Sequence, residues 1–152
     1  MILWRISRHA NLDGFGGLVA SARWHTAGRR IVYLADSPAS ALLETLVHLE
    51  ISPDLVPADY RLLKLDAPET IGREAVSADS LGAGWEFKSQ VTRGVGDEWL
   101  RRGSTALLRV PSALVPNTDN WLLNPDHADA RAIAMVWERA FPFDGRLFRF
   151  AK

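Results

Sequence analysis

Residues 30–44 have the sequence Arg30-Ile-Val-Tyr-Leu-Ala-Asp-Ser-Pro-Ala-Ser-Ala-Leu-Leu-Glu44, in which a strand pattern passes directly into a helix pattern. The β-branched and aromatic residues at 30–35 predict a strand. Ser37 is a suitable N-cap for the helix, and Pro38 occupies the first helical position, where a missing N–H costs nothing. We expect this helix to end before Pro53.

The two faces of this helix differ in polarity. The apolar residues that recur at i, i+3, i+4 and i+7 predict its core face, and they are Ala39, Leu42, Leu43, Leu46 and Val47. Glu44 lies away from that stripe, which favours a solvated carboxylate. However, its small neighbours leave room for a ligand, and His48, one turn later, could share a proton with it.

The remaining segments mix strands and helices without a regular β-α-β alternation. Residues 2–8 predict a half-buried strand with Ile2, Trp4 and Ile6 on one face, and further strands are expected at 60–66, 105–110 and 120–123. A helix is expected at 86–102. Residues 129–140 fit either a helix or a strand, and 141–150 have strand character. We therefore predict a single α+β domain over residues 1–152, with a mostly antiparallel sheet and packed helices.

Composition excludes several kinds of protein. Eighteen basic and eighteen acidic residues give a formal net charge of zero, which disfavours direct nucleic-acid binding. The chain has no cysteine, and its four histidines are not paired at ligand spacing, so we expect no metal site. No apolar run approaches the ~20 residues of a membrane span. The N-terminal residues do not resemble a secretory signal, so a cytoplasmic protein is expected.

Three side chains in the first third of the chain suggest nucleotide chemistry. Arg23 follows a glycine-rich loop, and an arginine fork can clamp a phosphate. Tyr33 could stack its ring on a base and leave its hydroxyl in water. Glu44 could stabilise a sugar-like cation. Together they suggest a nucleotide whose glycosidic bond is broken, although each residue alone is more often a surface ion pair, a packing residue or a solvated acid.

Two later residues are weaker candidates. Ser112 follows a strand but lies in no Gly-x-Ser-x-Gly motif, so a turn role or a contact with a ligand is favoured over nucleophilic catalysis. Asn124 lies in a turn. A Gly-x-Gly-x-x-Gly fingerprint is absent, which argues against a Rossmann dinucleotide site.

The order and spacing of several short motifs resemble the RES domain family. These motifs are Arg23-Trp24 with Gly28, Val32-Tyr-Leu-Ala35, Ala41-Leu-Leu-Glu44 with His48, Leu108-Arg-Val-Pro-Ser112 and Asn120-Trp-Leu-Leu-Asn-Pro-Asp-His127. Arg23, Glu44 and Ser112 match the residues that name the family, and Tyr33 matches the tyrosine that accompanies them. The chain departs from the usual Gly-Gly-Arg-Trp-Asn, because it has Ser21-Ala-Arg-Trp-His25.

The resemblance implies the toxin half of a type II toxin–antitoxin pair, with a fold similar to ADP-ribosylating toxins. It further implies NAD⁺ as substrate, no cofactor, inorganic phosphate as a possible second substrate, and substrate contacts from Trp24, His48 and Asn124. The implied partner is an antitoxin with an Xre-like helix-turn-helix, in a hetero-oligomer. Hydrolysis or phosphorolysis of the nicotinamide–ribose bond is the leading interpretation. ADP-ribosyl transfer to a protein and a non-catalytic interaction module stay open.

Overall fold

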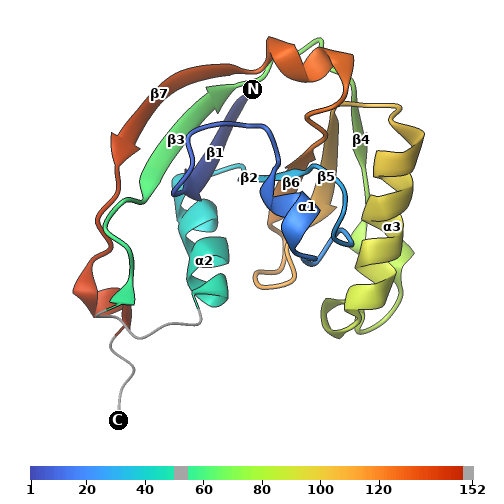
Figure 1. Ribbon diagram of the computed structural model, residues 1–152. Helices are drawn as coiled ribbons and strands as arrows, with labels where there is room; N and C mark the ends of the chain where they lie inside the picture. Colours follow the sequence, from blue (N-terminus) through green and yellow to red (C-terminus); the bar gives the residue numbers. More distant parts are fainter. Residues whose placement is uncertain (50–54, 149–152) are drawn as a thin grey trace.

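The computed structural model describes residues 1–49 and 55–148, and within these ranges seven strands form one sheet (Figure 1). Their order across the sheet is β4-β5-β6-β2-β1-β3-β7. The strands are β1 (Ile2–Ser7), β2 (Val32–Ala35), β3 (Arg61–Asp66), β4 (Arg73–Ala75), β5 (Leu107–Pro111), β6 (Asp119–Leu123) and β7 (Ala134–Ala140). Only β4 and β5 pair in parallel, and every other neighbouring pair is antiparallel. The predicted α+β class with a mostly antiparallel sheet is confirmed.

Two helices cover the same face of this sheet. These two are α2 (Pro38–His48) and α3 (Ser89–Arg102). The described residues also form the short helix α1 (Gly16–Val19) and the 3₁₀ turns η2 (Ala78–Leu81), η3 (Trp85–Phe87), η4 (Ala128–Ala132) and η5 (Gly145–Phe148). Ala41 of α2 belongs to the same buried cluster as Ala35 of β2, and Trp99 of α3 belongs to the same buried cluster as Leu122 of β6. Tyr33 on β2 is paired with Leu122 on β6, so their side chains lie on the same face of the sheet. Tyr33 and Ala35 also lie on that face, because alternate residues of a strand point to the same side. The two helices therefore stand on one face, with α1 between them in Figure 1.

Strands β1 and β2 part almost as soon as they meet. Trp4 and Ala35 are their one paired position among the described residues, whereas β1 pairs with β3 along its whole length. Beyond that pair the two strands diverge, and the space between them is available to side chains and ligands.

The helix predicted after Ser37 is confirmed in its start, but the prediction of its buried face is wrong. The Ser37 side chain accepts a hydrogen bond from the Ser40 N–H at 3.1 Å, as an N-cap does. Ala41 is only 5% exposed, while Leu43 and Val47 of the predicted core stripe are 38% and 46% exposed. The small Ala41 lets the helix backbone approach the sheet, so the turn that carries Glu44 faces the sheet. Leu43 and Val47 are left exposed, while Leu42 still packs against the core cluster that includes Ala41.

Two further predictions are corrected near the chain ends. In β1, Leu3 is buried on one face and Ile6 on the predicted face, while Ile2 is exposed, because the strand has a core cluster on each side rather than on one. The ambiguous segment resolves into the 3₁₀ turn η4 followed by strand β7. The strand predicted at 141–150 is wrong over 141–148, where the structure has a loop and the turn η5, and residues 149–150 lie outside the described ranges.

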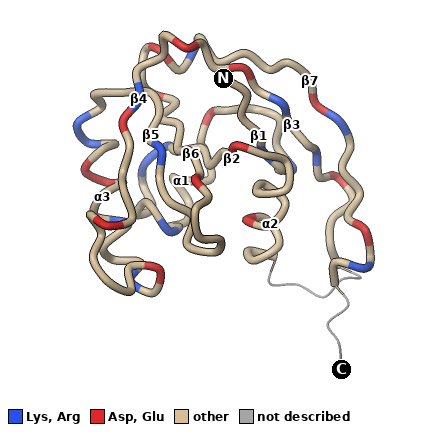
Figure 2. The backbone as a smooth tube through the Cα atoms, turned by 180° about the vertical axis from the view of Figure 1, so that it is seen from behind, with Lys and Arg blue, Asp and Glu red and all other residues tan. Residues whose placement is uncertain are grey.

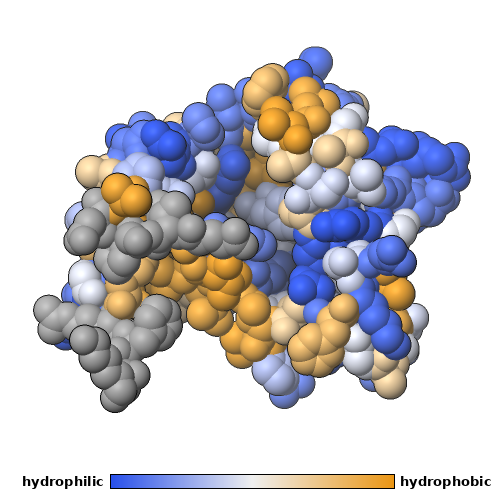
Figure 3. Space-filling view, turned by 60° about the horizontal axis from the view of Figure 1, so that its bottom comes forward, coloured by the Kyte–Doolittle hydropathy of each residue, from blue (hydrophilic) through white to orange (hydrophobic). Residues whose placement is uncertain are grey.

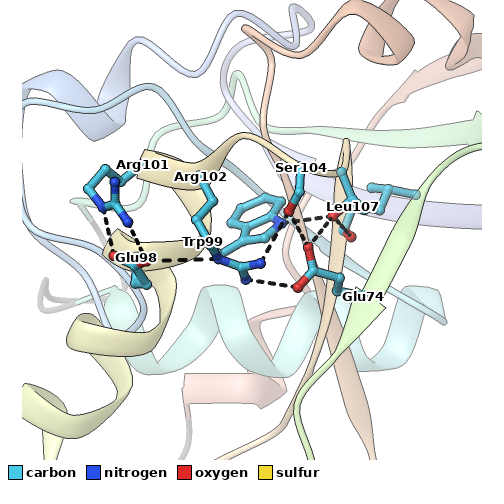
Figure 4. Close-up of polar contacts among 8 residues, drawn as sticks. Glu74, Glu98, Trp99, Arg101, Arg102, Ser104 and Leu107 are labelled. Carbon is cyan, nitrogen blue, oxygen red and sulfur yellow. Dashed lines mark hydrogen bonds and ion pairs between the residues drawn. The ribbon is translucent and has the colours of Figure 1, made fainter.

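A polar network ties the end of α3 to strand β4 (Figure 4). Gly103 ends the helix with φ +58°, and the following Ser104 donates to Glu74 Oε1. Arg102 donates to Glu74 Oε2 at 2.8 Å, and the Trp99 indole N–H donates to the Thr105 hydroxyl at 3.0 Å. The hydroxyl of Ser104 and the guanidinium of Arg102 hold the pKa of Glu74 below its usual value. Helix α3 is thereby fixed on the sheet.

Helix α3 in turn holds the segment that carries Arg23. The Thr92 hydroxyl donates to the Arg23 carbonyl at 2.6 Å, and the Arg93 Nε donates to the Ala22 carbonyl at 2.8 Å. Gly96 is buried against the Trp24 carbonyl, which a Cβ at that position would overlap. Glycine is therefore required at 96 for close approach rather than for an unusual φ.

Gly96→Ala is expected to destabilise the protein by at least about 2 kcal/mol, because the methyl group forces α3 away from the Trp24 backbone. Gly94→Ala is the matched control, since it lies in the same helix with no atom within 4 Å of an added Cβ. That control should gain about 0.5–1 kcal/mol from higher helix propensity. Denaturant unfolding of both variants measures the difference, and equal effects would contradict the close contact.

Candidate active site

Three of the residues selected from the sequence line one cleft of about 480 Å³. Arg23 comes from the loop before β2, Tyr33 from β2 and Glu44 from α2. The face seen in Figure 3 is hollowed near its centre, and apolar side chains gather beside the recess. The size lies within the usual range for small-molecule sites. The expectation that these three side chains converge on one cavity is confirmed.

Glu44 is held through one of its two oxygens. Oε1 accepts a hydrogen bond from the Asn120 amide at 2.7 Å and from the Ser112 hydroxyl at 3.1 Å. No described side chain donates to Oε2. Glu44 is also the one acidic residue of α2, which carries no Lys or Arg (Figure 2). The carboxylate is thus fixed by two neutral donors, and its second oxygen is available to the cleft.

The hydroxyl of Ser112 makes three hydrogen bonds within the protein, one as donor and two as acceptor. It accepts hydrogen bonds from the Leu114 and Val115 N–H groups at 3.1 and 3.2 Å while it donates to Glu44. Both lone pairs of this oxygen accept main-chain N–H groups, so the hydroxyl is unsuited to nucleophilic attack even though a carboxylate accepts its proton. Ser112 is a turn residue, and the hydrogen bond that it donates orients the Glu44 carboxylate.

Asn120 was missed by the sequence analysis as a site residue. It lies on β6, lines the cleft, and has a buried Oδ1 atom with no hydrogen-bond partner in the described part of the chain. A buried amide normally satisfies both of its ends. The signal available in the sequence was its position, directly before the three apolar residues Trp121, Leu122 and Leu123 of a predicted strand.

Arg23 keeps its charge available to the cleft. One guanidinium nitrogen donates to the Glu86 carbonyl at 2.9 Å, and no described carboxylate lies within 4.0 Å. The surface ion pair that is the usual state of an arginine is therefore not what the structure shows. The remaining donors of the planar fork can meet an anion.

The hydroxyl of Tyr33 is buried, contrary to the expectation that water surrounds it. It accepts a hydrogen bond from the Trp24 N–H at 3.1 Å and lies 2.9 Å from Nδ1 of His25. Burial raises the pKa of the phenol far above its usual value, so it stays protonated. Because the oxygen already accepts from Trp24, we assign its proton to His25 Nδ1, which places the imidazole proton on Nε2. The ring of Tyr33, not its hydroxyl, is what a ligand would meet.

The other selected residues divide between the cleft and the rest of the protein. Trp24 and His48 line the cleft, although Trp24 is nearly covered by protein and no hydrogen bond joins His48 to Glu44. Asn124 lies outside it. Its side chain accepts the Asp126 N–H at 3.1 Å and closes a turn, so the structure does not bring Asn124 to the proposed substrate.

The cleft is electropositive on balance. Its lining includes Arg5, Arg8 and Arg23, of which Arg8 is paired with Asp59 at 2.7 Å, against the single carboxylate of Glu44. Arg5 was not selected from the sequence, and burial lowers the pKa of its guanidinium.

Within the described ranges, no group of three or more His, Asp or Glu side chains could hold a metal ion. Among the described helices, none has the length and apolar character to cross a membrane.

His25→Asn is expected to reduce the acid sensitivity of the fold. Burial lowers the pKa of His25 below its usual 6.5, so the unfolded chain takes up the proton first as the pH falls. This contribution to stability is complete above about pH 6.5 and declines as the pH falls toward the lower pKa of the folded state. Melting temperatures at about pH 7.5 and about pH 5.5 should therefore differ more for the wild type than for His25→Asn. His48→Asn, at an exposed histidine, is the control, and identical losses in all three proteins would contradict the assignment.

Comparison with known proteins places the chain among proteins of this fold. A family model described as the RES domain matches residues 2–144. The protein named Toxin Res of Pseudomonas putida is 47% identical over 148 residues, covering 97% of this chain and all of that protein. The Prs ADP-ribosylating toxin of Sphingobium sp. is 35% identical over 158 residues, covering 97% of each.

A solved structure supports the same grouping at the level of the fold. A chain in the crystal structure of the M. tuberculosis MbcT–MbcA toxin–antitoxin complex superposes with a TM-score of 0.66. The match covers 97% of this chain and 86% of that one at 15% identity, which shows a shared fold. From the family match and the two relatives, the chain belongs to the RES domain family.

Proposed function

We propose that this protein is the toxin of a toxin–antitoxin system and acts in the cytoplasm by cleaving the nicotinamide–ribose bond of NAD⁺. The observation that carries the proposal is the Glu44 carboxylate, fixed through Oε1 and open at Oε2, in a cleft whose other charged side chains are the arginines Arg5, Arg8 and Arg23. The names of the relatives as toxins, one of them ADP-ribosylating, support it.

The proposed reaction makes use of a single carboxylate. When the bond between the ribose C1′ and the pyridinium nitrogen breaks, its electron pair goes to the nitrogen, and neutral nicotinamide leaves. The sugar becomes an oxocarbenium-like cation, which a nearby carboxylate stabilises. Ordinary glycosides need a second carboxyl group as general acid, but a pyridinium leaves without protonation. A cleft whose lining has Glu44 as its one acidic residue suits this leaving group.

The other residues would bind and position the substrate. Arg23 would hold a phosphate, and the ring of Tyr33 would stack on the nicotinamide or its ribose. Ser112 would act through Glu44, because its hydroxyl already has three hydrogen bonds within the protein. No cofactor enters this scheme.

The acceptor of the sugar separates three versions of the activity. Water gives ADP-ribose, inorganic phosphate gives a phosphorylated ADP-ribose, and a protein side chain gives a modified protein. The relative named ADP-ribosylating toxin supports the last of these as the second candidate. Mass analysis of the products of NAD⁺, with and without phosphate and with a cell extract, distinguishes the three.

The proposed partner is an antitoxin with an Xre-like helix-turn-helix, bound in a hetero-oligomer. The similar fold found in a toxin–antitoxin complex supports this proposal. A protein that acted only by binding would inhibit growth without consuming NAD⁺.

Glu44→Gln is expected to lower the rate of NAD⁺ consumption by at least about a hundredfold, because the amide carries no charge to stabilise the cation. Glu86→Gln is the control, since the Glu86 main chain supports Arg23 but its side chain does not line the cleft. Release of free nicotinamide from purified protein measures both. Wild-type rates in a folded Glu44→Gln protein would refute the proposed role.

Ser112→Ala and Asn120→Ala are each expected to lower the rate about tenfold, because each removes a donor that fixes the same oxygen of Glu44. The rate of the double variant should fall by a smaller factor than the product of the two single reductions, since both donors act on the same carboxylate. Asn124→Ala, which removes a buried asparagine outside the cleft, should lower stability and leave the rate per folded molecule unchanged. A rate loss at Asn124 equal to that at Asn120 would contradict this assignment.

A further inference from the structure

Strands β3 and β7 form an open part of the sheet beyond helix α2. Trp4 of β1 is paired with Lys64 of β3, which is paired in turn with Trp137 of β7. Arg139, two residues after Trp137, lies on the same side of the sheet, because alternate residues of a strand do. This is the side on which α2 packs against β1 and β2, and in Figure 1 β3 and β7 lie to the left of that helix. We call the surface formed by these four side chains the cationic face.

Two stacked pairs order the side chains of the cationic face. Nζ of Lys64 lies 5.6 Å from the centre of the Trp4 ring, and Cζ of Arg139 lies 4.3 Å from the centre of the Trp137 ring. The two indoles meet edge to face, with their centres 5.5 Å apart. A cation held over a ring keeps its N–H groups available to an acceptor. The four side chains therefore form one continuous row that presents two oriented cations.

The charge of this face is not balanced by the described residues. No described carboxylate lies within 4.0 Å of Lys64 or Arg139. On the opposite side of the same two strands, Arg61 and Glu138 form an ion pair at 3.1 Å. Asp66, the acidic residue on the Lys64 side of β3, contacts the N-terminal ammonium at 3.4 Å. One side of this part of the sheet is thus neutralised, and the other is open to an anionic partner.

A protein segment that carries carboxylates fits this face better than other occupants do. Carboxylates accept charge-assisted hydrogen bonds from both kinds of cation, and apolar side chains beside them would cover the accessible parts of the indoles. A second copy of this chain would bring two faces of like charge together in a symmetric contact, which is repulsive. A nucleic acid needs a longer basic stripe than two cations, and the formal net charge of the chain is zero.

We propose that the cationic face binds an acidic segment of a partner protein, with one carboxylate on Lys64, another on Arg139 and apolar side chains against the two indoles. Because Trp4 also lines the cleft, a partner held here lies beside the cleft that contains Glu44. Binding of this kind requires no cleavage of NAD⁺, so it is independent of the proposed function.

Fluorescence anisotropy with two short labelled peptides tests this surface. The acidic probe repeats the sequence Glu-Leu-Ser, and the neutral probe has Gln in place of each Glu. The wild-type protein should bind the acidic probe at least about fivefold tighter than the neutral one at low ionic strength. Added salt should reduce this preference, because exposed charge pairs are screened.

The double variant Lys64→Gln with Arg139→Gln should bind the two probes equally. Its matched control is Arg29→Gln with Arg131→Gln, which removes the same charge from two exposed arginines outside the cationic face. The control should keep the wild-type preference. Trp137→Leu leaves the charge unchanged and should weaken binding of the acidic probe at least about threefold, because it removes the ring that orients the guanidinium. Thermal melts show which variants remain folded.

Four results would overturn the assignment. The first is equal binding of both probes by the wild type, and the second is a preference that survives in the folded double variant. The third is a labelled oligothymidylate that binds more tightly than the acidic probe and is lost in the double variant, which would make the face a nucleic-acid site. The fourth is a wild-type dimer in sedimentation that the double variant does not form, which would make the occupant a second copy.

Discussion

One carboxylate oxygen, Oε1 of Glu44, joins helix α2 to strand β6 and to the loop after β5. An ionised carboxyl group can face a sheet only where hydrogen-bond donors replace the water it loses. The Asn120 amide and the Ser112 hydroxyl supply those donors. The rotation of α2 about its axis accords with this contact, because Ala41 and Glu44, three residues apart, share the inner side of the helix and Leu43 lies on the outer side. The position of the helix and the geometry of the cleft have the same cause.

Local sequence signals predicted the elements better than they predicted their orientation. Ser37 and Pro38 marked the start of α2 because capping depends on neighbouring residues alone. The buried face of α2 could not be found in the same way. The amphipathic rule assumes that the apolar stripe meets the core, and it fails where a functional carboxylate competes for the inner position.

The candidate site was predicted in part, and the resemblance to a family contributed more than spacing did. Arg23, Tyr33 and Glu44 were found, since they lie in motifs. Asn120 also lies in a motif but was given no role, and Arg5 was not selected, because each lies within a strand pattern, where a polar residue is ordinarily a solvent-facing one. The buried state of the Tyr33 hydroxyl depends on Trp24 and His25, which approach it only in the folded chain.

The hydrogen bond from the Trp24 main chain to Tyr33 makes the arginine segment and the aromatic wall one rigid unit. Gly96, Thr92 and Arg93 brace that unit from behind. A substitution that shifts the tyrosine ring therefore also shifts the adjacent guanidinium, and neither can be adjusted independently in evolution. Divergence of ligand preference among such proteins should instead accumulate in the glycine-rich loop, whose exposed positions are free of this brace.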